Sequence, residues 1–182
     1  MDKIGGNKFL DPKYIFSQIG LTPGQRVADL GCGAMGHFVF SAAEAVGSGG
    51  QVYAVDIRQI VLVGIKNRAR IDGVDNIETI WANLETFKSS GIATESLDLV
   101  MLFNTLFQNK KREEILKEAV RITKPGGHLA IIDWQPQETL FGPPLEMRVD
   151  PDKVKKFCQS NGLQLEREFI AGNFHFGLLF KK

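Results

Sequence analysis

Cysteine is scarce in this sequence of 182 residues, which contains Cys32 and Cys158 and no other. Two cysteines cannot form the disulfide framework of a small secreted domain. No cluster of histidine and cysteine accompanies them with the spacing of a zinc site. The sequence therefore predicts neither a disulfide-dependent fold nor a metal centre.

Long hydrophobic runs are missing as well. No apolar run approaches the ~18 residues that a membrane-spanning helix needs. The opening residues, MDKIGGNKF, lack the apolar core of a signal peptide. We therefore expect no membrane span and a cytoplasmic location.

The sequence has no large excess of one charge. Its 22 basic and 21 acidic residues give a formal net charge of +1, which indicates no bulk attraction to nucleic acid. A hydrophobic content of 43% and a charged content of 24% exclude a disordered chain. The length suits one domain over residues 1–182, and we expect a monomer or homodimer that acts on a small molecule rather than nucleic acid.

Short β-branched segments alternate along the chain with segments of helical periodicity. Within residues 110–124, for example, the apolar residues fall on one helical face and charges occupy the others. Strands that alternate with helices predict right-handed crossovers and a parallel sheet. The expected strands are Arg26–Leu30, Gln51–Ile57, Ile77–Trp81, Leu97–Phe103 and His128–Trp134.

Turn and cap residues agree with this alternation. Asp11-Pro12 and Asp150-Pro151 each predict a helix start, with an acidic N-cap before a proline at the first helical position. Residues 125–127, Pro-Gly-Gly, predict a tight turn before the fifth strand.

The C-terminal stretch has a different pattern. Residues 163–170 alternate in polarity, and an aromatic run, FHFGLLF, follows residues 171–173, Ala-Gly-Asn. Two strands joined by a few such residues predict an antiparallel hairpin. His175 lies inside the aromatic run, where we expect a structural role.

A glycine-rich segment, VADLGCGAMGHF, carries the strongest functional signal. Gly31, Gly33 and Gly36 fit the pattern G-x-G-x-x-G after a strand, and Asp56 follows Gly36 by 20 residues. Glycines let the backbone approach a ligand closely, and the acid can bind ribose hydroxyls. The pattern alone is compatible with both NAD and S-adenosylmethionine.

Three features around this segment decide between the two ligands. Asp29 precedes the glycines in the form DLGCGAMG, a helix over residues 11–19 precedes the first strand, and RITKPGGHLAIIDW leads into the terminal hairpin. Together they resemble the class I S-adenosylmethionine-dependent methyltransferases over nearly the whole chain. The small "type 11" group, related to quinone-biosynthesis methyltransferases, is the most similar. The resemblance implies a Rossmann-like, doubly wound α/β sheet of seven strands in the order 3-2-1-4-5-7-6, with residues 1–25 as an N-terminal helical cap.

The resemblance also implies how S-adenosylmethionine would bind and leave as S-adenosylhomocysteine. The methionyl part would lie on the glycine loop and Asp29, and Asp56 would accept both ribose hydroxyls. Asn83 stands where the family usually has an aspartate that contacts the adenine amino group. The implied cofactor-binding residues are Asp29, Gly31, Cys32, Gly33, Gly36, Asp56, Ile57, Asn83, Leu84, Phe103 and Asn104.

The methyl acceptor is expected beside two loops, residues 104–109 and 134–149, which follow the fourth and fifth strands. The fourth-strand segment LFNTLFQ lacks the Asn/Asp-Pro-Pro-aromatic signature of enzymes that methylate amino groups of nucleobases or glutamine. We expect in-line methyl transfer to a small molecule, and no residue stands out as a catalytic base. Candidate acceptor contacts are Phe9, Tyr14, His37, Trp134, Glu146 and Arg148.

Two alternative functions remain open at this point. An NAD(P)-linked oxidoreductase could use the same glycine loop, but the two tyrosines, Tyr14 and Tyr53, are expected in a helix and inside a strand, poorly placed for hydride chemistry. A non-catalytic module of methyltransferase fold, which senses the cofactor or scaffolds a partner, is the other alternative.

Overall fold

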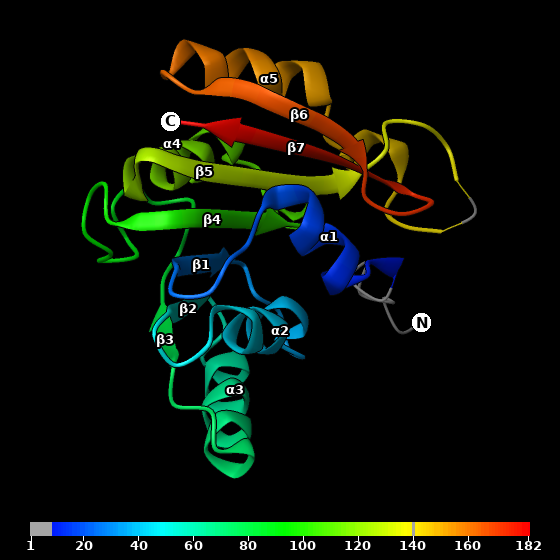
Figure 1. Cartoon of the computed structure of the whole chain (residues 1–182). Helices are drawn as coiled ribbons and strands as arrows, with labels where there is room; N and C mark the ends of the chain where they lie inside the picture. The colour runs from blue at the N-terminus through cyan, green and yellow to red at the C-terminus, as the bar shows by residue number, and fades with distance from the viewer. Residues whose placement is uncertain (1–8, 140) are drawn as a thin grey trace.

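A seven-stranded sheet forms the centre of the computed structural model, which describes residues 9–139 and 141–182 (Figure 1). The strand order is β3-β2-β1-β4-β5-β7-β6, and β7 is antiparallel to both of its neighbours. This is the order and the mixed direction that the sequence predicts. The strands are β1 (Arg26–Leu30), β2 (Gln51–Asp56), β3 (Ile77–Trp81), β4 (Leu97–Phe103), β5 (Thr123–Trp134), β6 (Gln164–Ile170) and β7 (His175–Lys181).

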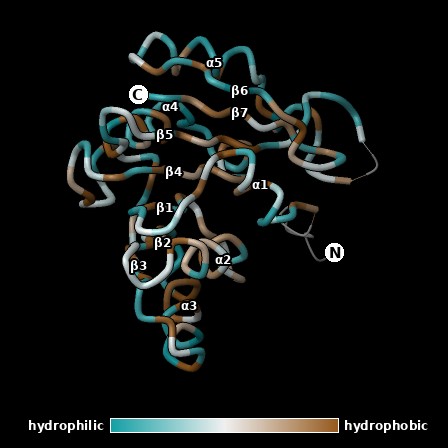
Figure 2. The backbone as a smooth tube through the Cα atoms, viewed as in Figure 1, coloured by the Kyte–Doolittle hydropathy of each residue, from teal (hydrophilic) through white to brown (hydrophobic). Residues whose placement is uncertain are grey.

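Helices cover both faces of the sheet. On one face, α1, α2 and α3 pack against one apolar cluster, and on the other α4 and α5 pack against a second. Figure 2 shows the central strands largely brown, whereas α5 is largely teal because its outer side is polar. The helices are α1 (Pro12–Ile19), α2 (His37–Val46), α3 (Gln59–Asp72), α4 (Arg112–Ile122) and α5 (Pro151–Ser160), with short 3-10 turns η2 (Leu106–Gln108) and η3 (Leu145–Met147).

Local sequence determines where α1 and α5 begin. The Asp11 carboxylate accepts the Lys13 N–H at 3.0 Å, and the Asp150 carboxylate accepts the Asp152 N–H at 2.9 Å. The proline at the first helical position lacks an N–H. This loses no hydrogen bond, because an N–H at that position has no partner within the helix. Both predicted helix starts are confirmed.

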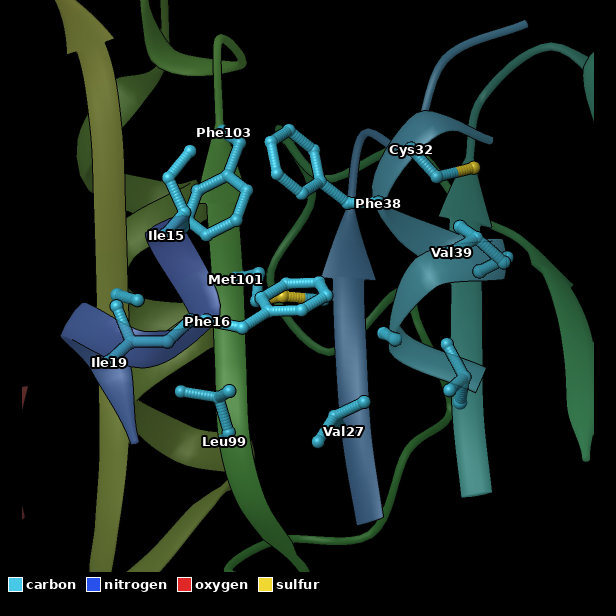
Figure 3. Packing of buried hydrophobic residues seen from close by; sticks show 14 of the residues in the cluster. Ile15, Phe16, Ile19, Val27, Cys32, Phe38, Val39, Leu99, Met101 and Phe103 are labelled. Atoms are coloured by element: carbon cyan, nitrogen blue, oxygen red, sulfur yellow. The ribbon is translucent and has the colours of Figure 1, made fainter. Parts of the chain in front are cut away.

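The first apolar cluster fixes α1 and α2 beside the ends of the strands. Figure 3 shows Phe16 of α1 and Phe38 of α2 above β1 and β4, with Phe103 beside Phe38. The rings of Phe38 and Phe103 are 4.6 Å apart in an edge-to-face arrangement, a geometry that adds to the area buried. The packing of these buried rings fixes the start of α2 relative to the sheet. It thereby also fixes the glycine loop that precedes α2.

The fifth strand begins earlier than predicted. The sequence indicated a turn at residues 125–127 and a strand from His128, but β5 extends back to Thr123, which pairs with Leu97 of β4. The pairing then shifts register, so that Leu99 faces His128. Residues 124–127 therefore form an irregularity within the strand, because the extra residues between the two pairs must leave the ladder.

The connection from β3 to β4 contains no helix in the structure and is fastened by one buried acid. Glu118 of α4 is fully buried and accepts the Lys88 N–H at 2.9 Å and the Ser90 hydroxyl at 2.5 Å. It also pairs with Arg121 at 2.7 Å. Burial raises the pKa of Glu118, but the hydrogen bonds from Arg121 and Ser90 outweigh burial and lower it.

Within the described residues no helix combines the length and hydropathy of a membrane-spanning segment. The longest of them, α3, has 14 residues. The cytoplasmic location expected from the sequence stays a prediction.

Removing the Glu118 carboxylate should release the β3–β4 connection. We expect Glu118→Ala to lower the free energy of unfolding by about 3 kcal/mol or more, because the largely buried Arg121 guanidinium loses the carboxylate that balances its charge. Urea unfolding at neutral pH measures this loss. Glu114→Ala, which removes a part-exposed partner of Lys117 one turn earlier, is the matched control and should cost less than about 1 kcal/mol. Equal losses in the two variants would contradict the assigned role.

Candidate functional site

The candidate site lies where the chain leaves the sheet in opposite directions. After β1 the chain enters α2 on one face, and after the neighbouring β4 it enters α4 on the other. In open α/β sheets such a divergence leaves a crevice at the carboxyl ends of the strands, and ligands bind there. The glycine loop, residues 31–36, borders this crevice.

The glycine loop depends on backbone conformations that other residues rarely adopt. Gly31, Gly33 and Gly36 have φ angles of 85°, 70° and 53°. The amides of Gly31 and Cys32 donate to the Val55 carbonyl at 2.8 and 3.1 Å, which ties the loop to β2. A Cβ at Gly31 would lie 2.6 Å from Thr105 Oγ1, whereas a Cβ at Gly33 would meet nothing within 4 Å.

Asp56 ends β2 and faces the glycine loop. Its carboxylate is 4% exposed and accepts the Gly33 N–H at 3.1 Å. The same carboxylate accepts the Arg58 amide at 2.9 Å and the Arg58 guanidinium at 3.1 and 3.3 Å. Because the Arg58 side chain is 56% exposed, its guanidinium can give way to a ligand hydroxyl at little energetic cost.

Asp29 is the second buried acid beside the loop. Its side chain is 2% exposed, and no described residue donates a hydrogen bond to its carboxyl group in the structure. Burial, followed by the nearby charge of Asp56, raises the pKa of Asp29 to about 7. A cationic group at this position would favour the ionised carboxylate and reverse that effect.

A cleft of ≈ 260 Å³ extends from the loop toward β3 and β4. Asn83 Oδ1 accepts the Glu85 N–H at 3.0 Å, so the amide oxygen already bonds locally. Leu84 is buried, and Ile57 is 53% exposed. The residues that line the cleft are Gly31, Asp56, Ile57, Arg58, Ala82, Asn83, Leu84, Thr105, Gln108 and Asn109.

A second hollow, of ≈ 430 Å³, lies between β3 and the segment 90–96 and shares no lining residue with the cleft. None of the candidate site residues borders it. Among the described residues, no group of three or more histidine, cysteine or acidic side chains could hold a metal ion.

Besides Asp29, Asp56 and Leu84, three further predicted cofactor residues have buried side chains. Cys32 is 2% exposed, and burial raises the pKa of its thiol far above the ordinary value, so it is no nucleophile. The Phe103 ring lies in the core against Phe38 rather than at the strand end. Asn104 is buried with a φ of 54°, and its backbone N–H donates to the Ile132 carbonyl at 2.8 Å. Asparagine adopts this left-handed conformation more readily than most residues other than glycine.

The predicted acceptor contacts do not come together in one group. The Tyr14 hydroxyl donates to the Ile170 carbonyl, and a ring nitrogen of His37 lies 3.0 Å from the Leu10 carbonyl. Glu146 is exposed on η3. In this structure the Tyr14 and His37 side chains therefore attach the N-terminal segment, and the Glu146 side chain faces solvent.

Phe9, Trp134 and Arg148, in contrast, meet at the carboxyl end of β5. The Phe9 and Trp134 rings are 6.2 Å apart, and the Arg148 guanidinium lies 5.7 Å from the centre of the Trp134 ring. Arg148 is 8% exposed and donates to oxygens of its own loop. Its partners are the carbonyls of Gln135, Gln137, Phe141 and Pro143 and the Thr139 hydroxyl.

The sequence interpretation missed the contribution of β7 to this end of the sheet. His175 pairs with Trp134 across the strands, and their rings are 4.3 Å apart. The sequence signal for this contribution was the polar His175 within the run FHFGLLF. Its position opposite Trp134 follows only from the register of β7 against β5.

Comparisons with known proteins agree with this geometry. A family model described as "Methyltransferase domain" matches residues 21–173. The chain is 29% identical over 128 residues to a demethylmenaquinone methyltransferase of Geobacillus kaustophilus, covering 70% of this chain and 53% of the relative. It is 31% identical over 125 residues to a ubiquinone/menaquinone biosynthesis C-methyltransferase of Haemophilus ducreyi, covering 68% and 46%. The chain thus spans about half the length of these curated relatives.

A solved structure is similar over nearly its whole length. The crystal structure of a SAM-dependent methyltransferase from Aquifex aeolicus superposes with a TM-score of 0.86 at 26% sequence identity. The superposition covers 98% of this chain and 93% of the other. The match therefore includes the sheet, the glycine loop and the terminal hairpin together.

The contact between Gly31 and Thr105 generates a test of the loop. Gly31→Ala should lower the free energy of unfolding by about 2–4 kcal/mol, because the new Cβ clashes with Thr105 and the φ angle is strained. Gly33→Ala, with open space around its Cβ, should lose about 1–2 kcal/mol from the φ angle alone. Urea unfolding followed by circular dichroism compares the two. Similar losses would show that the loop does not rest on Thr105.

Proposed function

Because this chain belongs to the class I S-adenosylmethionine-dependent methyltransferases, we propose that it binds S-adenosylmethionine in the cleft at the glycine loop and transfers its methyl group to a small molecule. The observation that carries this proposal is the pair of buried acids, Asp29 and Asp56, on either side of a glycine loop whose backbone is open to a ligand at Gly33. An acid for the ribose and an acid for a cationic end match the two polar ends of the cofactor.

The residues present fit the cofactor. Asp56 would bind the ribose hydroxyls after Arg58 swings away, and its bond to the Gly33 amide keeps the carboxylate oriented. Asp29 would face the methionyl end, where the ligand's ammonium group offers the donor that the described protein residues do not. Ile57 and Leu84, at the side of the cleft beside Asn83, would hold the adenine.

When bound, the cofactor supplies an activated methyl group on a sulfonium. The chain's own contribution is to hold the acceptor in line with that group, and such positioning can supply up to ~7–11 kcal/mol of the barrier. Asn104 and Trp134, which lie at the ends of β4 and β5, are buried and would shield the neighbourhood of the strand ends from water. No separate metal or redox group is needed for this transfer.

A small organic acceptor is supported by the relatives and by the architecture. The curated relatives are named for menaquinone and ubiquinone biosynthesis. Within the described residues, the N-terminal segment and the loops after β4 and β5 lie at the carboxyl ends of the strands, where we expect the acceptor to bind. A quinone-related aromatic compound is the first acceptor class to test.

Calorimetric titration tests cofactor binding directly. We expect S-adenosylhomocysteine to bind with micromolar affinity and NAD⁺ not to bind. Asp56→Ala should weaken binding by at least about tenfold, because a charged hydrogen-bond partner of the ribose contributes ~1.5–3 kcal/mol. Asp152→Ala, which removes an exposed acid on α5, is the control and should leave the affinity unchanged. Binding of NAD⁺ instead would overturn the proposal, and so would the absence of binding to either ligand.

The raised pKa of Asp29 makes cofactor binding depend on pH. Below a pH of about 7 the carboxyl group is protonated in the free protein, and the ligand's ammonium group favours the ionised form. The affinity for S-adenosylhomocysteine should therefore fall as pH decreases from 8 to 5.5, by up to about tenfold per pH unit.

Asp29→Asn separates this effect from other titrations. The variant should bind more weakly at pH 8 and lose the steep dependence below pH 7. Calorimetry in buffers of different ionisation enthalpy would also measure proton release on binding to the unmodified protein. A wild-type affinity that stays constant over this pH range would contradict the role given to Asp29.

A further inference from the structure

Five ring side chains form a cluster at the carboxyl end of β5. Phe174 lies 5.3 Å from Phe9, 5.7 Å from Phe141 and 6.4 Å from Trp134, measured between ring centres. His175 lies against the Trp134 ring at 4.3 Å with an interplanar angle of 39°. We call these five residues, Phe9, Trp134, Phe141, Phe174 and His175, the aromatic cluster.

The cluster contains buried polar atoms for which the described residues offer no hydrogen-bond partner. Trp134 is 1% exposed and His175 is 0% exposed. Neither the indole Nε1 of Trp134 nor either ring nitrogen of His175 has a hydrogen-bond partner among the residues that the structure describes. Leaving such atoms buried and unpaired is unfavourable, and native structures satisfy most of them, so a polar ligand group or an ordered water is expected to bond them.

The register of the sheet relates the cluster to the cofactor cleft. Phe103, Ile132 and Gly177 are aligned across β4, β5 and β7, and Trp134 and His175 form the next pair on the same face. That face also carries the buried Phe103 at the end of β4, directly before Asn104. The unpaired atoms therefore lie at the carboxyl end of β5, two residues further along that strand than Ile132, which pairs with Phe103 at the end of β4.

The charges around the cluster restrict what it can bind. Arg148 is buried over the Trp134 ring, and no described carboxylate pairs with it. Burial, and then the charge of Arg148, lower the pKa of His175 to about 4, so the imidazole is neutral at physiological pH. A positive ligand would be repelled by Arg148, whereas a neutral hydroxyl group finds both a donor and an acceptor.

We propose that the aromatic cluster is the acceptor-binding subsite, and that it takes a planar aromatic compound with a hydroxyl group that donates to His175 and accepts from the Trp134 N–H. The ring of the acceptor replaces part of the contact between Phe9, Phe141 and Trp134, which must separate to admit it. Gly142 permits the close cover over Trp134, since a Cβ there would lie 2.6 Å from the indole ring. This proposal rests on the proposed function, because it completes the same site.

Histidine-ring NMR tests the subsite with three matched probes. The chain has three histidines, and the ring ¹⁵N signals of His175 are assigned from their loss in His175→Phe. We expect 4-ethylphenol, added to the full chain with saturating S-adenosylhomocysteine, to shift the His175 signals and leave those of His128 in place. It should bind about tenfold more tightly than 4-ethylanisole, which cannot donate a hydrogen bond, and more tightly than tyramine, which adds an ammonium group.

The variants separate a binding role from a structural one. His175→Phe keeps the ring and removes both nitrogens, so it should abolish the preference for 4-ethylphenol over 4-ethylanisole. Trp134→Phe should weaken both probes, because both accept the indole N–H. His128→Phe is the control, since His128 pairs with Glu166 on the surface, and it should change nothing. An undiminished preference in His175→Phe, or unshifted His175 signals, would overturn the subsite.

Failure of this proposal is distinguishable from failure of the proposed function. His175 lies outside the cofactor cleft, so S-adenosylhomocysteine should bind His175→Phe with the affinity of the unmodified chain. Binding of S-adenosylhomocysteine without a His175-dependent preference for the phenol rejects the subsite alone. A His175-dependent preference for the phenol in a chain that binds no S-adenosylhomocysteine rejects the proposed function alone.

Discussion

The parallel pairing of β1 with β4 is the constraint on which the rest of the site depends. Their chains leave the sheet toward opposite faces, and the gap between the two exits cannot be filled by either helix. Gly31 presses against Thr105 across this gap and brings the glycine loop to the end of β4. The positions of both buried acids follow from the pairing of β1 with β2, because Asp56 ends β2 and Asp29 lies within β1.

Burying two acids beside each other is unfavourable unless a ligand or a cation compensates them. Asp56 has its compensation within the chain, from the Gly33 amide and from Arg58. Asp29 has none from the described residues and responds with a raised pKa. Because the charge of Asp56 is compensated by described residues and that of Asp29 is not, we regard Asp29 as the group that the cationic end of a ligand would stabilise.

Local patterns with few alternatives predicted the helix starts at Asp11 and Asp150 and the position of the glycine loop. The sheet order was implied by the resemblance to the class I methyltransferases. The sequence could not predict that the Phe103 ring turns into the core or that Arg148 bonds its own loop, since both depend on packing between distant segments. The turn expected at residues 125–127 became an irregularity of β5 for the same reason. The position of His175 beside Trp134 likewise depends on the pairing of β7 with β5.

The contacts of Arg148 have a consequence for how this protein can diverge. Four of its five partners are backbone carbonyls, at Gln135, Gln137, Phe141 and Pro143. An arginine that recognises peptide oxygens is indifferent to the side chains that those residues carry. Substitutions along the loop can therefore alter the wall of the proposed acceptor site while the loop keeps its path, so that new acceptor specificities would be accessible to selection without loss of the fold.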